Sequence, residues 1–94
     1  MTFSLISYDI TDDTRRTRIY QLLRNHGERV QYSVFECHLP DKKLQELRNQ
    51  LFKLIDPRVD SVRIYRLCKK CLFGVEVVGA GRVPEGVSDL PNIV

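Results

Sequence analysis

Apolar positions along this chain recur first at strand spacing and then at helix spacing. Residues 3–9 form an apolar run rich in β-branched and aromatic side chains, which predicts a first strand. The apolar positions that follow recur every three or four residues, which predicts a helix over about 13–26. Thr11 or Asp12 suits the N-cap of this helix, and Gly27 is typical of the residue that ends one.

The rest of the chain adds a second helix and further strands. Residues 29–39 carry large apolar side chains on both faces of a predicted strand, so we expect both faces to be covered. A stripe of leucines predicts a helix that opens at Asp41 and ends before residues 56–60. Residues 61–67 and 71–79 predict two more strands. The sum is an α+β fold with two helices on one face of a four-stranded sheet.

The order of these elements leaves the topology open. Only one strand, residues 29–39, lies between the two predicted helices, whereas a ferredoxin-like domain needs two. That segment could supply both strands if it contains a bend. The tail over residues 80–94 ends in apolar Ile93 and Val94, so it either frays or packs on something, for example a second subunit.

Length and composition indicate one small globular domain. The chain has 94 residues, of which 43% are hydrophobic and 29% charged. No apolar run approaches the roughly 20 residues that a membrane span needs. The N-terminal segment lacks a basic region before its apolar run, so it does not resemble a signal peptide, and we expect a cytoplasmic protein without membrane contact.

Positive charge is concentrated after the first predicted strand. The net charge is only +3, but a single acid, Glu28, stands among five arginines. Arginine makes forked contacts to phosphate, although an ordinary solvated basic surface explains the pattern equally well. These arginines are Arg15, Arg16, Arg18, Arg24 and Arg29.

The three cysteines predict reduced thiols. Cys68 and Cys71 have the spacing of metal ligands, but zinc takes four ligands. The other candidates, Cys37 and His38, are neighbours whose side chains point to opposite faces of a strand. We therefore expect no zinc site and no disulfide framework.

Asp9 is the candidate metal ligand. Asp12 and Asp13 are explained by the start of the helix, where a cap and a negative charge are favourable. Asp9 ends the first strand without such a role, so it either pairs with an arginine or binds a cation such as Mg²⁺. One carboxylate per chain is a small number of ligands for a cation, but in a symmetric dimer a two-fold axis would bring the Asp9 of the second chain close. Arginines of the next helix would then contact the phosphodiester backbone.

The stretch "YDITDDTRRTRIYQLLRNHGERVQYSVFEC", together with the later "VRIYRLCKKC", resembles the CRISPR-associated protein two family, the small subunit of the spacer-acquisition machinery. The resemblance covers essentially the whole chain. It implies a ferredoxin-like β-α-β-β-α-β fold in a symmetric homodimer. It also implies a domain over residues 1–79 and a C-terminal docking segment, residues 80–94, that adds a strand to the partner's sheet.

The same resemblance implies a metal-dependent endonuclease that hydrolyses phosphodiester bonds, in single-stranded RNA for some members of the family and in double-stranded DNA for others. Asp9 would bind Mg²⁺, or Mn²⁺ in its place, opposite its symmetry mate, and the bound water would be the nucleophile. Phosphate would be held by Arg16, Arg18 and Arg29. The remaining positions that the resemblance connects with activity are Tyr8, Ser33 and Phe35.

Two alternatives remain at this point. The family is also thought to act as a non-catalytic DNA-binding scaffold that bridges dimers of its partner, the CRISPR integrase, and that role does not need the Asp9 metal site. Without the resemblance, the pattern also suits a small metabolite-binding module whose arginines are ordinary surface.

Overall fold

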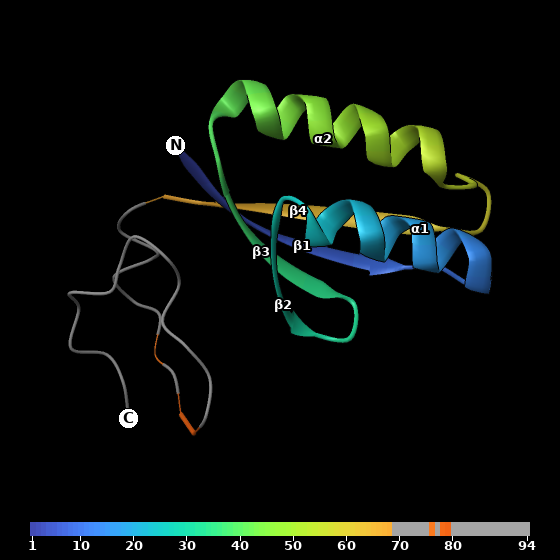
Figure 1. Ribbon diagram of the computed structural model, residues 1–94, viewed down its shortest axis with the longest axis horizontal. Coiled ribbons are helices and arrows are strands. Elements are labelled where there is room, and N and C mark those ends of the chain that lie inside the picture. The colour runs from blue at the N-terminus through green and yellow to red at the C-terminus, as the bar shows by residue number, and fades with distance from the viewer. Residues whose placement is uncertain (69–75, 77, 80–94) are drawn as a thin grey trace.

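A four-stranded antiparallel sheet carries both helices on one face (Figure 1). The computed structural model describes residues 1–68, 76, 78 and 79. The strands lie side by side in the order β2-β3-β1-β4, so β1 is central and β2 is at an edge. The elements are β1 (Thr2–Asp9), α1 (Asp13–Arg24), β2 (Gly27–Gln31), β3 (Val34–Leu39), α2 (Asp41–Leu54) and β4 (Ser61–Leu67).

The single strand predicted over residues 29–39 is wrong. The chain turns at Tyr32 and Ser33, so this region contains most of β2 and all of β3, which pair with each other. The turn has no glycine, proline or asparagine, the residues that usually signal a hairpin, and the sequence pattern therefore runs through it. The resulting order of elements is β-α-β-β-α-β, the order that the family resemblance implied.

The start of α1 confirms one of the two expected caps. The side chain of Asp12 accepts a hydrogen bond of 2.9 Å from the backbone N–H of Arg15, and Asp13 lies in the first turn. The leucine stripe of α2 is also confirmed, since Leu44, Leu47 and Leu51 are buried. Capping and amphipathic spacing therefore placed both helices correctly.

Gly27 does not end α1 in the expected way. The helix ends at Arg24, and the ring of His26 donates from Nδ1 to the carbonyl of Leu22 at 2.9 Å. Gly27 begins β2 without a positive φ angle. A Cβ atom at this position would lie 2.3 Å from the carbonyl oxygen of Glu36 and 2.5 Å from the Sγ atom of Cys37. Glycine is needed here because β3 approaches closely.

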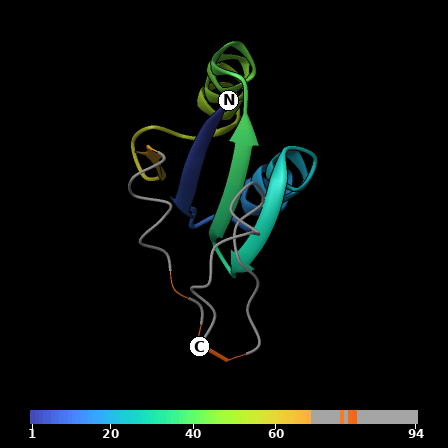
Figure 2. The ribbon, with the colours of Figure 1, turned by 90° about the vertical axis from the view of Figure 1, so that its left-hand side faces the viewer.

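The core fills the space between the helices and the sheet. Ile6 of β1, Ile19 and Leu23 of α1, and Leu47 of α2 are fully buried, and Phe35 of β3 is 1% exposed. Figure 2 looks nearly along the helix axes and shows both helices on the same side of the sheet. Both helices bury their apolar stripes on the same sheet face, which gives this small domain one continuous core.

The opposite sheet face is not covered by a helix of the described residues. It carries the rings of Phe3 and His38, which stack with their centroids 4.0 Å apart. The strand expected over residues 71–79 and the docking segment expected over residues 80–94 lie outside the described residues, apart from positions 76, 78 and 79. In the part that the structure describes, neither helix is long and apolar enough to span a membrane.

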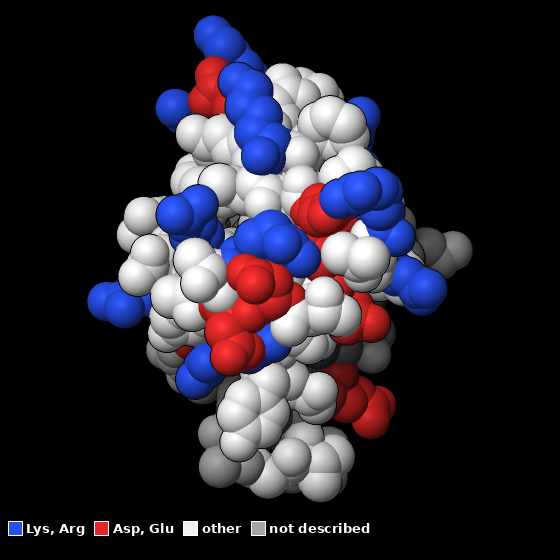
Figure 3. All heavy atoms as spheres, turned by 90° about the vertical axis from the view of Figure 1, so that its right-hand side faces the viewer, with Lys and Arg blue, Asp and Glu red and all other residues white. Residues whose placement is uncertain are grey.

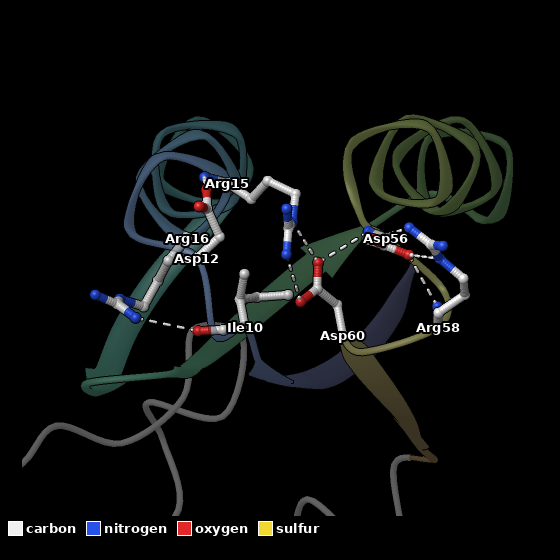
Figure 4. A network of polar contacts seen from close by, with 7 residues as sticks. All are labelled: Ile10, Asp12, Arg15, Arg16, Asp56, Arg58 and Asp60. Atoms are coloured by element: carbon white, nitrogen blue, oxygen red, sulfur yellow. Dashed lines mark hydrogen bonds and ion pairs between the residues drawn. The ribbon is translucent and has the colours of Figure 1, made fainter.

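A forked ion pair joins the start of α1 to the loop before β4 (Figure 4). Arg15 donates from Nε and Nη2 to the two carboxylate oxygens of Asp60, at 2.7 and 3.3 Å. The backbone N–H of Asp56 donates to the same carboxylate at 2.8 Å. The side chain of Asp60 is fully buried, so its negative charge depends on these donors.

These contacts lower the pKa of Asp60. The hydrogen bond from Arg15 is the main cause, and backbone N–H groups add to it, while burial acts in the opposite direction. A lowered pKa in the folded state means that the carboxylate stabilises the fold above the pKa of the unfolded chain, about 3.9. This stabilisation is lost as the pH falls through the folded-state pKa.

We expect Gly27→Ala to lower the free energy of unfolding by about 1–3 kcal/mol, because the added methyl group would press against the backbone of β3. Urea unfolding measures the change. Val30→Ala, at a half-exposed position in the same strand, is the control and should change stability little. Equal stability of wild type and Gly27→Ala would contradict the close approach of the two strands.

We expect Asp60→Asn to lower the unfolding temperature at neutral pH by roughly 5–10 °C. The difference from wild type should begin to shrink as the pH falls below about 4, since Asp60 of the unfolded wild-type chain then binds a proton, and it should shrink further as the pH falls through the lowered folded-state pKa. Calorimetry across this pH range measures both effects. Glu46→Gln, which removes an exposed carboxylate from α2, should follow wild type at every pH. A pH-independent difference would show that the charge of Asp60 is not what stabilises the fold.

Candidate functional site

A cleft of about 480 Å³ lies where the end of β1, the first half of α1 and the β2–β3 turn meet. Five of the seven residues that the sequence assigned to a site line it: Tyr8, Asp9, Arg16, Arg29 and Ser33. Its other lining residues are Ile10, Thr17, Tyr20 and Tyr32. Segments far apart in the sequence thus bring the expected carboxylate and two of the expected arginines into one place.

Asp9 is the carboxylate of this cleft. It is the last residue of the central strand, where it pairs with Ser61 of β4. Its side chain is exposed and has neither a hydrogen bond nor an ion pair among the described residues. The expectation that Asp9 might pair with an arginine is therefore not met within this part of the chain. An unpaired carboxylate at a rigid strand end is available to a cation.

Arg16 and Arg29 supply the positive charge. Arg16 donates from Nη1 to the carbonyl of Ile10 at 3.1 Å (Figure 4). It also pairs with Asp13. The guanidinium of Arg29 lies over the ring of Tyr20, 5.1 Å from its centroid. One arginine is thus held by the backbone beside Asp9 and the other by an aromatic face. Both retain donors that can reach a phosphate.

Tyr8 fixes the β2–β3 turn to the central strand. Its hydroxyl donates to the carbonyl of Tyr32 at 3.2 Å, and its backbone N–H donates to the carbonyl of Ser33 at 3.0 Å. Burial raises the pKa of Tyr8, although Arg29 opposes this effect, so the hydroxyl stays protonated at neutral pH and acts as a donor.

Phe35 and Arg18, both assigned to the site, do not line the cleft. Phe35 is buried behind it, with its ring centroid 6.3 Å from that of Tyr8 and 5.8 Å from that of Tyr20. Arg18 is exposed on α1. Tyr20 packs against Phe35 and also lines the cleft, although it was not assigned to the site from the sequence. Its position four residues after Arg16, on the same helix face, was the available signal.

The five arginines do not form one basic surface. Arg15 is bound to Asp60, and Arg24 is exposed in the last turn of α1. At the end of the molecule that Figure 3 faces, acidic and basic side chains lie side by side. The local charge is therefore mixed, and a phosphate would be attracted by the two arginines of the cleft rather than by a broad positive field.

The two cysteines that the structure describes, Cys37 and Cys68, do not line this cleft. Cys37 is buried, and burial, assisted by the charge of Glu36, raises the pKa of its thiol to about 11. It is thus an inert core residue. Cys71 lies outside the described residues, among which no group of three or more His, Cys, Asp or Glu side chains could hold a metal ion.

This geometry defines a small α+β protein with a cleft lined by one carboxylate and two arginines. The family model described as CRISPR associated protein Cas2 matches residues 1–75. This chain belongs to that family.

Curated relatives support the same assignment. The chain is 47% identical over 89 residues to "CRISPR-associated endoribonuclease Cas2 1" of Chloroflexus aurantiacus, covering 94% of this chain and 96% of the relative. It is 46% identical over 80 residues to "CRISPR-associated endonuclease Cas2 2" of Thermus thermophilus, covering 85% of this chain and 84% of that protein.

Solved structures share the fold. The hypothetical protein TT1823 from Thermus thermophilus has a TM-score of 0.77 at 44% identity, covering 89% of this chain and 98% of the other. Streptococcus pyogenes Cas2 at pH 6.5 has a TM-score of 0.71 at 32% identity, covering 82% and 99% of the two chains. A chain of a partial Cas6-RT-Cas1–Cas2 complex has a TM-score of 0.72 at 27% identity, covering 82% and 84%.

We expect Tyr8→Phe to lower the free energy of unfolding by about 1 kcal/mol, because the carbonyl of Tyr32 loses its donor. Hydrogen exchange at the β2–β3 turn should become faster at the same time. Tyr20→Phe is the matched control, since the hydroxyl of Tyr20 makes no hydrogen bond among the described residues. If both variants behave alike, the hydroxyl of Tyr8 does not hold the turn.

Proposed function

We propose that this protein is a divalent-cation-dependent endonuclease of CRISPR adaptation that hydrolyses phosphodiester bonds as a homodimer. The observation that carries the proposal is the Asp9 carboxylate at the end of β1, which has no partner within the described part of the chain and lies in a cleft that also contains Arg16 and Arg29. The names of the relatives support a nuclease, and they differ over its substrate, since some are endoribonucleases and one is an endonuclease. RNA and double-stranded DNA are both retained as substrates.

The side chains that could coordinate a divalent cation in this cleft are few. Asp9 is a hard oxygen ligand, as Mg²⁺ and Mn²⁺ prefer, but the described part of one chain offers no cluster of three or more ligating side chains. Mg²⁺ is often held by one or two carboxylates, with water and substrate phosphate completing its shell. A two-fold axis near Asp9 would supply the second carboxylate. When bound, such a cation activates water and neutralises phosphate charge.

The protein's own residues would position the substrate. Arg16 and Arg29 bind the phosphate from two sides of the cleft, each held in place by a contact of its own. Tyr8 and Ser33 shape the wall through the anchored turn, and Phe35 supports it from the core. Arg18, outside the cleft, contacts the backbone of the nucleic acid further along.

The dimer is part of this proposal. We assign residues 1–79 to a ferredoxin-like domain and residues 80–94 to a segment that adds a strand to the partner's sheet. A homodimer explains how a cleft with one carboxylate becomes a complete cation site.

The alternative function is a non-catalytic DNA-binding scaffold that bridges copies of the integrase. The observation that favours it is the fold shared with a chain of a partial Cas6-RT-Cas1–Cas2 complex. The arginines of the cleft would serve that role without hydrolysis. Membership of the family favours both functions over a metabolite-binding module.

We expect Asp9→Asn to lower the rate of RNA or DNA cleavage with Mg²⁺ or Mn²⁺ by about 100-fold or more, because the uncharged amide oxygen is a much weaker ligand for these cations than a carboxylate. Salt-dependent binding of nucleic acid should persist, since the arginines remain. Glu46→Gln, which removes an exposed carboxylate of α2 outside the cleft and away from its arginines, is the control and should cleave normally.

Unchanged cleavage by Asp9→Asn would refute the catalytic proposal. A variant that loses cleavage but still supports spacer acquisition would show that the protein acts there as a scaffold. Loss of acquisition together with cleavage would make the hydrolysis part of the pathway.

A further inference from the structure

Tyr32 is a large aromatic side chain that the fold itself does not use. It is 91% exposed, and its side chain makes no hydrogen bond or ring contact among the described residues. It also stands in a tight turn, where glycine, asparagine or aspartate would be the usual choice. Neither packing nor turn chemistry explains a tyrosine at this position.

The backbone under Tyr32 is held firmly although its ring is exposed. Its carbonyl accepts the hydroxyl of Tyr8 at 3.2 Å, and the next carbonyl, that of Ser33, accepts the N–H of Tyr8 at 3.0 Å. The pairing of β2 with β3 shifts register between Arg29 and Gln31. A bulge of this kind re-aims the end of a strand. The ring therefore extends from a fixed point on the rim of the cleft.

The cleft beside Tyr32 contains cationic side chains. Arg29 and Arg16 line the same cleft, with Asp9 at its end. A flat aromatic face beside cations that bind phosphate matches the two parts of a nucleotide, its base and its backbone.

We propose that Tyr32 stacks on a nucleobase and thereby makes the cleft select unpaired strands. The proposal rests on the nuclease function proposed above and assigns to one residue, Tyr32, the distinction between unpaired and paired strands. A base inside a duplex has both faces covered by its neighbours, so it cannot stack on a side chain, whereas a single strand exposes its bases. Stacking needs the ring and not the hydroxyl.

The test measures binding of two probes to variants built on Asp9→Asn, which prevents cleavage of the probe. One probe is a short fluorescein-labelled single-stranded RNA, and the other is the same RNA in a duplex. We expect Tyr32→Ala to weaken single-strand binding by about 10-fold or more and to leave duplex binding unchanged. Tyr32→Phe should bind both probes like its parent.

Phe52→Ala is the control, because Phe52 is 69% exposed on α2 and does not line the cleft. It should bind both probes like its parent. The unfolding temperatures of all variants should agree, since the replaced rings are exposed.

Three results would overturn the proposal. Equal losses for both probes would show that Tyr32 does not read unpaired bases. Unchanged binding by Tyr32→Ala would show that the ring has no role in binding, and loss of self-association would assign it to a protein interface. In these cases the nuclease function stands. If the Asp9→Asn parent binds neither probe in a salt-dependent way, the proposed function fails, and the role of Tyr32 fails with it.

Discussion

The ion pair between Arg15 and Asp60 is the constraint on which the cleft depends. Asp60 is the residue before β4, and β4 pairs with the end of β1, where Ser61 faces Asp9. Arg15 is the residue before Arg16 on α1. One forked, partly buried contact thus fixes the helix that carries Arg16 and the strand end that carries Asp9. A buried carboxylate is stable only when donors surround it, so this geometry is strongly specified.

A second anchor closes the cleft from the other side. Tyr8 precedes Asp9 in the central strand and holds the turn that carries Tyr32 and Ser33. The Arg15–Asp60 pair thereby positions the α1 side of the cleft, and Tyr8 positions the side formed by the β2–β3 turn. Each anchoring residue is the chain neighbour of a residue of the cleft: Arg15 precedes Arg16, and Tyr8 precedes Asp9. Fixing the first residue of each pair therefore limits the movement of the second, even in a domain with a small core.

Much of this arrangement could be predicted before the fold was seen, and the failures have physical causes. The cap at Asp12 and the leucine stripe of α2 are local features that depend on a few neighbouring residues. The split of residues 29–39 into two strands was missed because the turn lacks the usual turn residues. The role of Gly27 was missed because it depends on a strand that approaches from elsewhere in the chain. Phe35 was assigned to the site, yet it is buried behind the cleft, since a strand residue near a site can face the core.

The sequence by itself determined the elements, the helix start and the candidacy of Asp9, because spacing, capping and strand ends are properties of neighbouring residues. The tertiary structure alone decided which arginines are available. Arg15 and Arg16 are adjacent and identical in chemistry, but one neutralises a carboxylate 45 positions away and the other borders the cleft. Local pattern cannot separate them, because the difference depends on which distant carboxylate the fold brings to each side chain.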